Sequence, residues 1–551
     1  MPADATHPPP PAQAKPVQPE LTLADHARLV RALQARLKAD AVVQTPISSI
    51  LLAGESAYKL KKPVHFPFID CRTRAQRRHF CEEELRLNRR TAAPLYLGLC
   101  AVTGTVEAPV LDGAGPPLDW AVHMRRFDAG AELRTLAERG ALRAADIDAL
   151  AAHLAAFHRA LPVLPEAAWP RKSLADWARE TLDELEALSA RGAPPEPAAF
   201  ARLREGLGAQ FAALAPLMHA RARSGHLREG HGDLHLGNLL RWGDGVMAFD
   251  ALEFEPALRC IDTVCDAAFA FMDLLAHGLD GWAWRFINAW AEATDEWAGL
   301  PLLRPCAAYR ALVRAKVAAL GGDAAAFARY FALAQRLAAR PESPQLLVMT
   351  GVSGSGKSRV AAGLAERLGA LRLRSDVERK RLFGLEPTAR AAPGSALAAT
   401  LYASGATTRT YARLYALAET LLRAGHTVVL DAAFLRQSER EAARALAQAC
   451  GAGFAVVACS APEAVLRERL AAREREGADP SDATAAVLER QLRVAEPIPA
   501  DWAAWTVEVD NSGDRAALDA ALAQAATRLA APHGENAQAT QNLKKNPPTP
   551  S

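Results

Sequence analysis

The chain has 551 residues, half of them apolar and 23% of them charged, with a formal net charge of +3. This length suggests three or four domains, or two large ones with tails, and the composition can build ordinary soluble cores. The small net charge argues against a protein that coats nucleic acid, although it is compatible with a local basic groove. The eight cysteines include no CxxC pair, which favours reduced thiols over a disulfide framework or a zinc site.

The pattern of apolar residues bears on the location of the protein. Charged residues or prolines interrupt every apolar run before it reaches the length of a bilayer span. The Pro-rich start lacks the basic residues and the apolar stretch of a secretory signal. The sequence therefore predicts a cytoplasmic protein with no membrane segment.

Composition divides the chain into two folded parts. Residues 1–20 are Pro-rich and residues 532–551 are polar, and both contain too few large apolar groups to fold. Residues 341–344 (PESP) place two prolines just before an apolar run, which predicts a linker. The folded parts are then residues 21–340 and 345–531.

The first folded part begins with a mixed region. After a helical start, residues 47–52 predict a strand, residues 53–56 a turn and residues 57–62 the returning strand. Alternation along that strand places Lys59 and Lys61 on the same face, from which either could reach into a cleft.

A charged helix is predicted next, over residues 74–90. Short strands follow, ending at residues 120–127, and the pattern is mostly helical from Ala131 to residue 340. A small mixed lobe followed by a large helical lobe is the order of a protein-kinase-like fold.

The sequence HGDLHLGN at residues 231–238 carries groups suited to phosphoryl transfer. Asp233 and Asn238 lie five residues apart on one loop, and Asp250 follows the apolar run 245–249. Phosphoryl transfer needs an oriented nucleophile and neutralised phosphate charge more than it needs covalent chemistry. A carboxylate and an amide on one loop can face the same metal ion, and the second carboxylate can close the site.

These residues also carry a family resemblance. HGDLHLGNLL followed by FDALEFEPALRCIDTVCDAAFAF resembles the aminoglycoside phosphotransferases and choline kinases, a branch of the protein-kinase-like superfamily. The whole chain is more similar to a bacterial group in which such a domain precedes a P-loop kinase domain of the AAA-labelled kind. The resemblance implies that Asp233 accepts the proton of the substrate hydroxyl, while Asn238 and Asp250 hold Mg²⁺ against the phosphates of ATP.

The resembled family also pairs a lysine of the small lobe with a glutamate on a helix. Lys59 or Lys61 would supply the lysine, and Glu83 or Glu84 the partner; Lys59 is favoured for cofactor binding. The turn at residues 54–56 has no GxGxxG pattern to cover phosphates, which puts that contact in doubt.

Other interpretations of this part stay open. His231 and His235 have the spacing of a zinc pair on a helix, although the glycines beside them disfavour a helix there. Asp262 and Asp266 could be catalytic, but the resemblance implies that they brace the catalytic loop. The domain could also be a pseudokinase that binds without catalysis.

The second folded part opens with a P-loop. GVSGSGKS at residues 351–358 follows the apolar run 345–350 and precedes a predicted helix over residues 359–368, which is the context that this motif requires. Glycines let backbone N–H groups converge on phosphate, Lys357 would reach the β- and γ-phosphates, and Ser358 would hold Mg²⁺. The predicted cofactor-binding residues are Gly351, Ser353, Gly354, Ser355, Gly356, Lys357 and Ser358.

Strands alternate with helices after the P-loop. They are predicted at residues 371–374, 427–430, 454–459 and 505–509, which implies a parallel sheet with right-handed crossovers. The predicted fold class is therefore a two-domain α/β and α+β protein. A protein-kinase-like bilobal domain comes first, and a three-layer P-loop NTPase domain with a parallel sheet follows.

The segment RSDVER at residues 374–379 resembles the acceptor-binding corner of gluconate kinases, zeta toxins and polynucleotide kinases. The resemblance implies that Asp376 is the catalytic base and that Arg379 binds the acceptor or the transferred phosphate. Asp431 resembles a second acidic position near Mg²⁺ or substrate, and its alternative role is a helix cap or a turn.

The charged helix at residues 467–476 resembles the lid of such kinases. Arg473 is favoured as the arginine that stabilises the transferring phosphoryl group, ahead of Arg469, and a solvated helical face is the alternative. Asp431 is followed by Ala432, so the Asp-Glu pair of energy-transducing AAA motors is missing and a kinase is favoured over a motor.

Together these patterns predict a bifunctional phosphotransferase that uses ATP and Mg²⁺ to phosphorylate hydroxyl groups of small polar metabolites. A nucleic-acid end is a less favoured acceptor, and no membrane partner is expected. The alternative is one active P-loop kinase, regulated by a kinase-like domain that binds a ligand without catalysis. A nucleotide-gated scaffold is a third possibility, and the sequence leaves the acceptors, the choice of ATP over GTP and the oligomeric state open.

Overall fold

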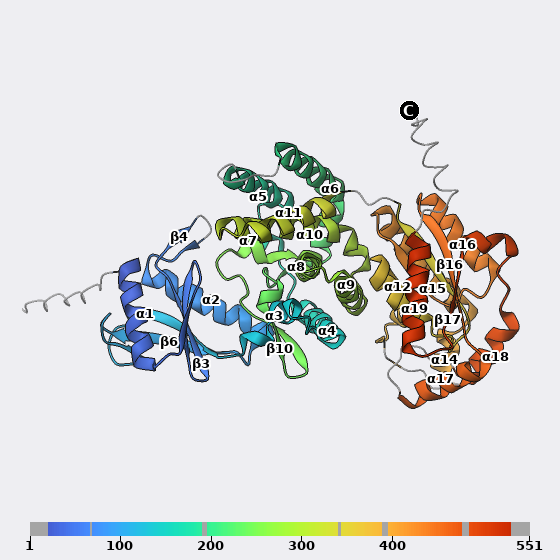
Figure 1. The fold of residues 1–551 in the computed structure, drawn as a ribbon, viewed down its shortest axis with the longest axis horizontal. Coiled ribbons are helices and arrows are strands. Elements are labelled where there is room, and N and C mark those ends of the chain that lie inside the picture. The colour runs from blue at the N-terminus through green and yellow to red at the C-terminus, as the bar shows by residue number, and fades with distance from the viewer. Residues whose placement is uncertain are drawn as a thin grey trace, which may run out of the picture. The chain divides into compact units, whose positions relative to one another are not determined.

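The computed structural model describes residues 20–66, 69–189, 196–339, 343–387, 389, 395–476 and 484–530. Both predicted tails therefore lie outside the described residues, apart from Glu20, and so does the linker apart from Ser343 and Pro344. The chain forms two compact units, one of Met1–Ala131 with Ala248–Pro256 and one of Glu132–Met247 with Ala257–Ser551. In Figure 1 most of the first unit is blue.

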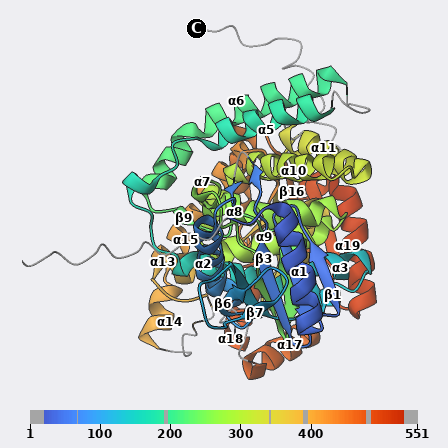
Figure 2. The same ribbon diagram turned by 90° about the vertical axis from the view of Figure 1, so that its left-hand side faces the viewer.

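The first unit is an antiparallel sheet with two helices, α1 (Leu23–Leu37) and α2 (Arg74–Ala92). Threonines start both helices, because Thr22 and Thr73 each accept the backbone N–H three residues on in a capping box. Leu29 and Leu33 of α1 are buried against Leu51 and Leu60 of the sheet, and Figure 2 shows the helix lying over these strands.

The sheet has the strand order β1-β2-β3-β8-β6-β7. Its strands are β1 (Ala41–Gln44), β2 (Ser48–Ala53), β3 (Ser56–Lys61), β6 (Tyr96–Gly104), β7 (Pro109–Leu111) and β8 (Asp119–Arg125), beside a small ribbon of β4 (His65–Phe66) and β5 (Ile69–Asp70). The predicted hairpin is confirmed: β2 and β3 pair Ile50 with Lys59, and the turn between them is tight.

The second unit begins with a helical region. Its α-helices are α3 (Leu133–Glu138), α4 (Ala144–Ala160), α5 (Leu174–Ser189), α6 (Pro197–Arg223), α7 (Pro256–Arg259), α8 (Thr263–Ala276), α9 (Asp280–Thr294), α10 (Leu303–Leu320) and α11 (Ala324–Ala338). Its short 3-10 turns are η2 (Glu166–Ala168), η3 (Leu236–Asn238) and η4 (Glu296–Leu302), and its short strands are β9 (Leu227–Glu229), β10 (Leu239–Trp242), β11 (Gly245–Ala248) and β12 (Cys260–Asp262). The 3-10 turn η1 (Ala129–Ala131) ends the first segment of the first unit. Every residue of α8 is buried, so this helix lies in the core of the helical region. Figures 1 and 2 both show α5 and α6 side by side.

The second unit ends with a parallel sheet in the order β14-β15-β13-β16-β17. The strands are β13 (Gln345–Thr350), β14 (Leu371–Arg374), β15 (Val428–Asp431), β16 (Gly453–Ser460) and β17 (Thr506–Asp510). The helices are α12 (Lys357–Leu368), α13 (Ser375–Leu382), α14 (Ala396–Leu401), α15 (Ser404–Arg423), α16 (Gln437–Ala449), α17 (Glu463–Glu476), α18 (Ala485–Val494) and α19 (Arg515–Ala530), with the 3-10 turn η5 (Ala500–Trp505). Val360 and Leu364 of α12 and Leu522 of α19 share a core with one face of the sheet, while α15 and α16 contact its strands as well. The predicted strands and the predicted two-domain fold class are confirmed.

Helix α9 closes the open edge of this sheet. Asn288 donates from Nδ2 to the Ala370 carbonyl (2.9 Å) and accepts at Oδ1 from the Arg372 N–H (2.7 Å) beside edge strand β14. An exposed strand edge leaves backbone groups unpaired, and this side chain satisfies two of them. No helix among the described residues is long and apolar enough to cross a membrane.

Candidate active sites

Two lysines and three carboxylates form a cluster in the first unit. Lys59 Nζ lies 2.8 Å from Glu84 Oε1 and 2.6 Å from Asp250 Oδ1, while Lys61 Nζ lies 2.6 Å from Glu84 Oε2 and also pairs with Glu253. Alternation along β3 does place both lysines on one buried face, as predicted. Glu84 is the helix glutamate that holds them.

Asp250 is the residue of this cluster that is most exposed to solvent. Its side chain is 42% exposed, whereas the side chains of Lys61 and Glu84 are fully buried. Asp250 has a positive φ of 60°, a rare conformation for a residue other than glycine that recurs at functional sites. Lys59, which contacts Asp250, is therefore the lysine that faces the accessible side, and Lys61 with Glu253 forms the buried side.

Electrostatics fix the charge state of the cluster. Burial alone lowers the pKa of Lys59, but the carboxylates of Asp250, Glu84 and Glu253 outweigh it and raise that pKa well above its ordinary value. Both lysines are thus charged at neutral pH. Glu83, the alternative partner, instead pairs with Arg86 on the surface at 2.8 Å.

Asp266 holds the HGDLHLGN loop of the second unit through hydrogen bonds to its backbone. Its carboxylate accepts the backbone N–H groups of His231 (2.8 Å) and Gly232 (2.9 Å), and His158 Nε2 lies 3.1 Å from it. Burial raises the pKa of this carboxyl, but the hydrogen bond and charge of His158 and the nearby His231 bring it below its ordinary value. The bracing role expected for Asp266 is confirmed.

Asp262 has a different position from Asp266. It holds Arg221 through two bonds of 2.7 and 2.9 Å and caps α8 by accepting from Val264 N. His231 is fully buried, and its Nδ1 accepts from Asp233 N at 3.3 Å. Among the described residues no group of three or more His, Cys, Asp or Glu side chains could hold a metal ion.

Asp233 and Asn238 lie together on the loop. Asn238 donates from Nδ2 to the backbone carbonyl and to Oδ2 of Asp233, both at 3.0 Å, and the Asp233 side chain is 32% exposed. A partly exposed carboxylate oriented by an amide can accept a proton from a hydroxyl group. Asn238 and Asp250 belong to different units, so their joint hold on Mg²⁺ stays a prediction.

The P-loop has backbone geometry that only glycine adopts readily. Gly351, Gly354 and Gly356 have φ angles of 141°, 86° and 80°, and a Cβ at Gly356 would lie 2.0 Å from Asn511 Nδ2. These conformations turn the loop into the N-terminus of α12, where free N–H groups and the helix dipole favour phosphate. Lys357 begins that helix, and its Nζ donates to the Val352 carbonyl at 2.9 Å.

Ser358, which follows the loop, contacts Asp431 at the end of β15. Ser358 Oγ donates to Asp431 Oδ1 at 3.1 Å, and Asp431 is only 5% exposed. Asp431 Oδ2 has no hydrogen-bond partner within the described part of the chain, although Arg374 Nε lies 3.9 Å away. A buried carboxylate oxygen without a partner beside a serine hydroxyl fits the oxygen ligands that Mg²⁺ prefers.

The two residues predicted to bind the acceptor, Asp376 and Arg379, lie in different surroundings. Asp376 lies half-buried in the first turn of α13, directly after β14, whose Arg374 pairs in register with Asp431. Arg379 is buried elsewhere: its Nη1 donates to the Leu401 carbonyl (3.0 Å) and to Thr407 Oγ1 (3.2 Å). In this structure Arg379 therefore contacts the end of α14 and the first turn of α15.

Arg469, which the sequence ranked behind Arg473 as the lid arginine, contacts the P-loop. Arg469 donates to the carbonyls of Gly354 (3.4 Å) and Asn511 (2.7 Å), whereas the side chain of Arg473 lies outside the described residues. Asn511 in turn donates to the Ser355 carbonyl at 3.0 Å, and Gln491 Oε1 accepts from Ser353 N at 2.7 Å. Sequence reasoning missed Asn511 and Gln491, because neither belongs to a motif.

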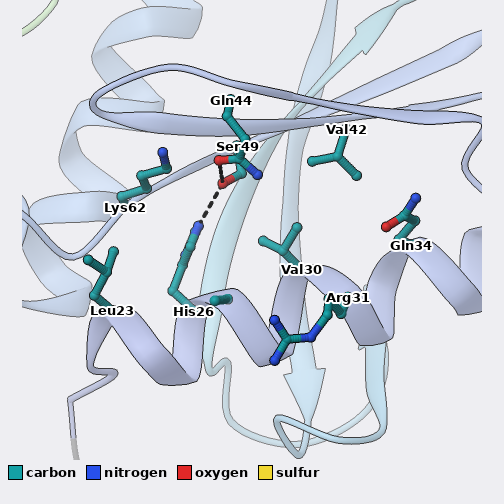
Figure 3. A pocket seen from close by; sticks show the side chains of 10 residues that line it. Leu23, His26, Val30, Arg31, Gln34, Val42, Gln44, Ser49 and Lys62 are labelled. Atoms are coloured by element: carbon teal, nitrogen blue, oxygen red, sulfur yellow. Dashed lines mark hydrogen bonds between the residues drawn. The ribbon is translucent and has the colours of Figure 1, made fainter.

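A separate pocket of about 320 Å³ lies between α1 and the sheet of the first unit (Figure 3). His26 Nε2 lies 3.0 Å from Ser49 Oγ across it, and burial lowers the pKa of His26 to about 4. None of the predicted site residues lines this pocket.

Comparisons with known proteins identify one domain by family model and two relatives that cover most of the chain. Residues 346–498 match the family model described as an AAA domain. The uncharacterized proteins Rv2004c of Mycobacterium tuberculosis and Mb2027c of Mycobacterium bovis are each 30% identical over 482 residues, which is 86% of this chain and 93% of the relative. The chain belongs to their family. Members of this family thus share both parts of the chain, because the match extends well beyond the AAA domain.

Solved structures of three kinases each match a portion of the chain. A gluconokinase from Sinorhizobium meliloti is 25% identical, covers 36% of this chain and 98% of its own, and has a TM-score of 0.26. The Mycobacterium tuberculosis APS kinase CysC, in complex with AMPPNP and APS, is 23% identical and covers 35% of this chain and 100% of its own, with a TM-score of 0.25. Choline kinase from Cryptosporidium parvum is 10% identical and covers 54% of this chain and 87% of its own, with a TM-score of 0.35.

The AAA-labelled P-loop domain recognised in the second part of the sequence is confirmed by the family model over residues 346–498. The choline-kinase-like recognition of the first part stays a prediction. Lys357 and Ser358 lie in the first turn of α12, directly after the glycine loop, which is the arrangement that the P-loop motif predicts.

Proposed function

We propose that the protein is a double phosphotransferase that transfers the γ-phosphoryl group of ATP to hydroxyl groups at two sites. The observation that carries the proposal is the cluster of Lys59, Glu84 and Asp250. A lysine–glutamate pair joined to an accessible carboxylate is the arrangement by which protein-kinase-like enzymes hold the phosphates of ATP and its metal ion. The P-loop supplies the second site.

At the first site, Lys59 would pair with phosphate oxygens, and Asp233 would take the proton of the acceptor hydroxyl. Asn238 would hold Asp233 in place and, with Asp250, would bind Mg²⁺. Magnesium supplies neutralisation of the phosphate charge when bound.

At the second site, Lys357 would contact the β- and γ-phosphates, and Ser358 and Asp431 would be the metal ligands. Asp376 would orient the acceptor hydroxyl and accept its proton, and Arg469 is placed to stabilise the lid against the loop. Arg379 and Arg473 remain proposals for acceptor and phosphoryl contacts. Small polar molecules are the proposed acceptors of both sites.

The competing function is a regulated single kinase, in which the first domain binds a ligand without catalysis. Acceptor-dependent ATP turnover by the full chain separates the two, measured for wild type, Asp233→Asn and Lys357→Ala. We expect each variant to abolish transfer to a different set of acceptors. If Asp233→Asn keeps all transfer activity, the first domain is a regulatory module and the double function is wrong.

A further inference from the structure

An arginine-lined pocket of about 410 Å³ lies in the second unit, between α3, α10 and α11. Its basic lining consists of Arg134 on α3, Arg314 on α10 and Arg329 on α11. Tyr330 forms part of the wall, and its ring lies 5.8 Å from the Arg314 guanidinium carbon. Nothing in the phosphate-handling machinery described above uses these arginines.

The pocket adjoins the loop that carries Asp233. Tyr330 donates its hydroxyl to Asp273 Oδ1 at 2.6 Å, and Asp273 Oδ2 accepts the Leu236 N–H at 2.7 Å. On the other side, the guanidinium carbon of Arg134 lies 3.2 Å from where a Cβ on Gly237 would be. Two lining residues therefore reach the catalytic loop directly or through one carboxylate.

Three buried arginine donor atoms on α10 have no hydrogen-bond partner among the described residues. Nε of Arg314 has no hydrogen-bond partner in the described structure, and the same holds for Nε and Nη2 of Arg310 one turn earlier. Arg310 is only 3% exposed, and its guanidinium carbon lies 4.9 Å from the centre of the Phe269 ring. Residues four apart share one helix face, so both guanidiniums lie on the same side of α10. A buried donor without an acceptor destabilises the fold, and more so when it is charged, so these atoms favour an anionic partner.

The charge of Asp233 reaches both arginines. Burial lowers the pKa of each guanidinium, but nearby acidic groups that include Asp233 outweigh it and raise the pKa of Arg310 and Arg314. The side of α10 that carries the unpaired donors therefore lies within electrostatic reach of Asp233.

The acidic groups of the pocket do not neutralise it. Asp323 uses Oδ1 to cap α11 by accepting from Ala326 N at 2.9 Å, and the other carboxylate of the lining is Glu138. Burial lowers the pKa of His277, which keeps it uncharged at neutral pH. Three guanidiniums thus face two carboxylates in the lining, with Arg310 as a further positive charge behind it.

We propose that this pocket binds a carboxylate or phosphate group of the acceptor molecule, and that the first domain phosphorylates hydroxy acids or sugar phosphates. The planar fork of arginine matches the oxygens of both groups through paired hydrogen bonds. The inference rests on the proposed function of the first site, and it narrows the acceptor from any small polar molecule to an anionic one.

The reaction balances without another reactant. The acceptor hydroxyl oxygen forms a bond to the γ-phosphorus, the bond from that phosphorus to the bridging oxygen breaks, and ADP leaves with the electron pair. Asp233 takes the hydroxyl proton, and the product is a phosphate monoester that keeps its original anionic group.

The test is calorimetric binding of matched probes to the full chain carrying Lys357→Ala, which weakens phosphate binding at the P-loop. The probes are glycerol, glycerate, glycerol 3-phosphate and inorganic phosphate. We expect the anionic probes to bind at least tenfold more tightly than glycerol, and Arg314→Gln to remove this preference. Arg314→Lys keeps the charge without the fork and should fall between the two. Arg336→Gln, a change at an exposed arginine of α11 outside the pocket lining, is the matched control.

Each outcome of these titrations has a distinct meaning. A phosphate preference over glycerate identifies phosphorylated acceptors, and the reverse identifies hydroxy acids; both support an anionic acceptor. The inference would be overturned if glycerol bound as tightly as the anionic probes. It would also be overturned if Arg314→Gln kept the preference for anionic probes while Arg314→Lys folded normally. Transfer from ATP is measured in parallel. Anion binding lost in Arg314→Gln, but with no transfer to any probe, counts against the proposed function and leaves the anion site standing.

Discussion

The two lysines of the β3 cluster should separate catalysis from stability. Lys61 is fully buried between Glu84 and Glu253, whereas Lys59 joins Glu84 to the 42% exposed Asp250. Lys61→Met leaves two buried carboxylates short of a partner. Removing one member of a buried ion pair costs about 3–5 kcal/mol, because the remaining charge stays desolvated.

Lys59→Met should cost less stability, because water can solvate Asp250 and Lys61 still pairs with Glu84. We expect a loss of about 1–3 kcal/mol in unfolding free energy, together with weaker ATP binding at the first site. Losing a charge-assisted bond to phosphate weakens binding by about 10–100-fold.

Urea unfolding of the full chain and calorimetric titration of an ATP analogue measure both effects. The control is Lys62→Met, whose lysine follows β3 and belongs to neither pair. Equal stability losses in the Lys59 and Lys61 variants would refute this reasoning, and so would unchanged nucleotide binding in Lys59→Met.

Three further changes test other parts of the structure. Asp266→Asn should leave one loop N–H without an acceptor and speed hydrogen exchange in residues 229–238 by at least tenfold; unchanged exchange contradicts the bracing role. Gly356→Ala should abolish analogue binding at the P-loop, because φ is 80° there and the Cβ would meet Asn511; retained binding contradicts the strain argument. Burial lowers the pKa of His426 to about 4 from 6.5, so its contribution to stability is complete above pH 6.5 and disappears as the pH falls through 4. Between pH 6.5 and 4 this loss lowers the free energy of unfolding of the wild type by up to about 3 kcal/mol, and His426→Asn should lack it. Unfolding midpoints measured across this pH range check the prediction, and an unchanged dependence on pH in the variant contradicts the assignment.

Local patterns predicted much of the fold and of the phosphate machinery. Left-handed backbone at Gly351, Gly354 and Gly356 follows from the motif itself, and alternation along β3 placed both lysines on one face. The strands of the parallel sheet followed from short apolar runs that end at turn residues.

The rest depends on contacts between distant segments. The phase of α2 decides that Glu84 and not Glu83 meets the lysines, and the partner Glu253 is 192 residues away from Lys61. Arg379 matched an acceptor pattern, but the position of the segment around Leu401 gives its guanidinium a structural partner. The unpaired donors of Arg310 and Arg314 have no signal in one sequence, because unpaired donors are visible only once the surrounding side chains are placed.

The most direct test of the double phosphotransferase is calorimetric titration of a non-hydrolysable ATP analogue with Mg²⁺ into wild type, Lys357→Ala and Asp250→Asn. The account predicts two sites in wild type, with Lys357→Ala losing one and Asp250→Asn losing the other. A single site in wild type that Lys357→Ala abolishes would contradict it, and the first domain would then bind no nucleotide.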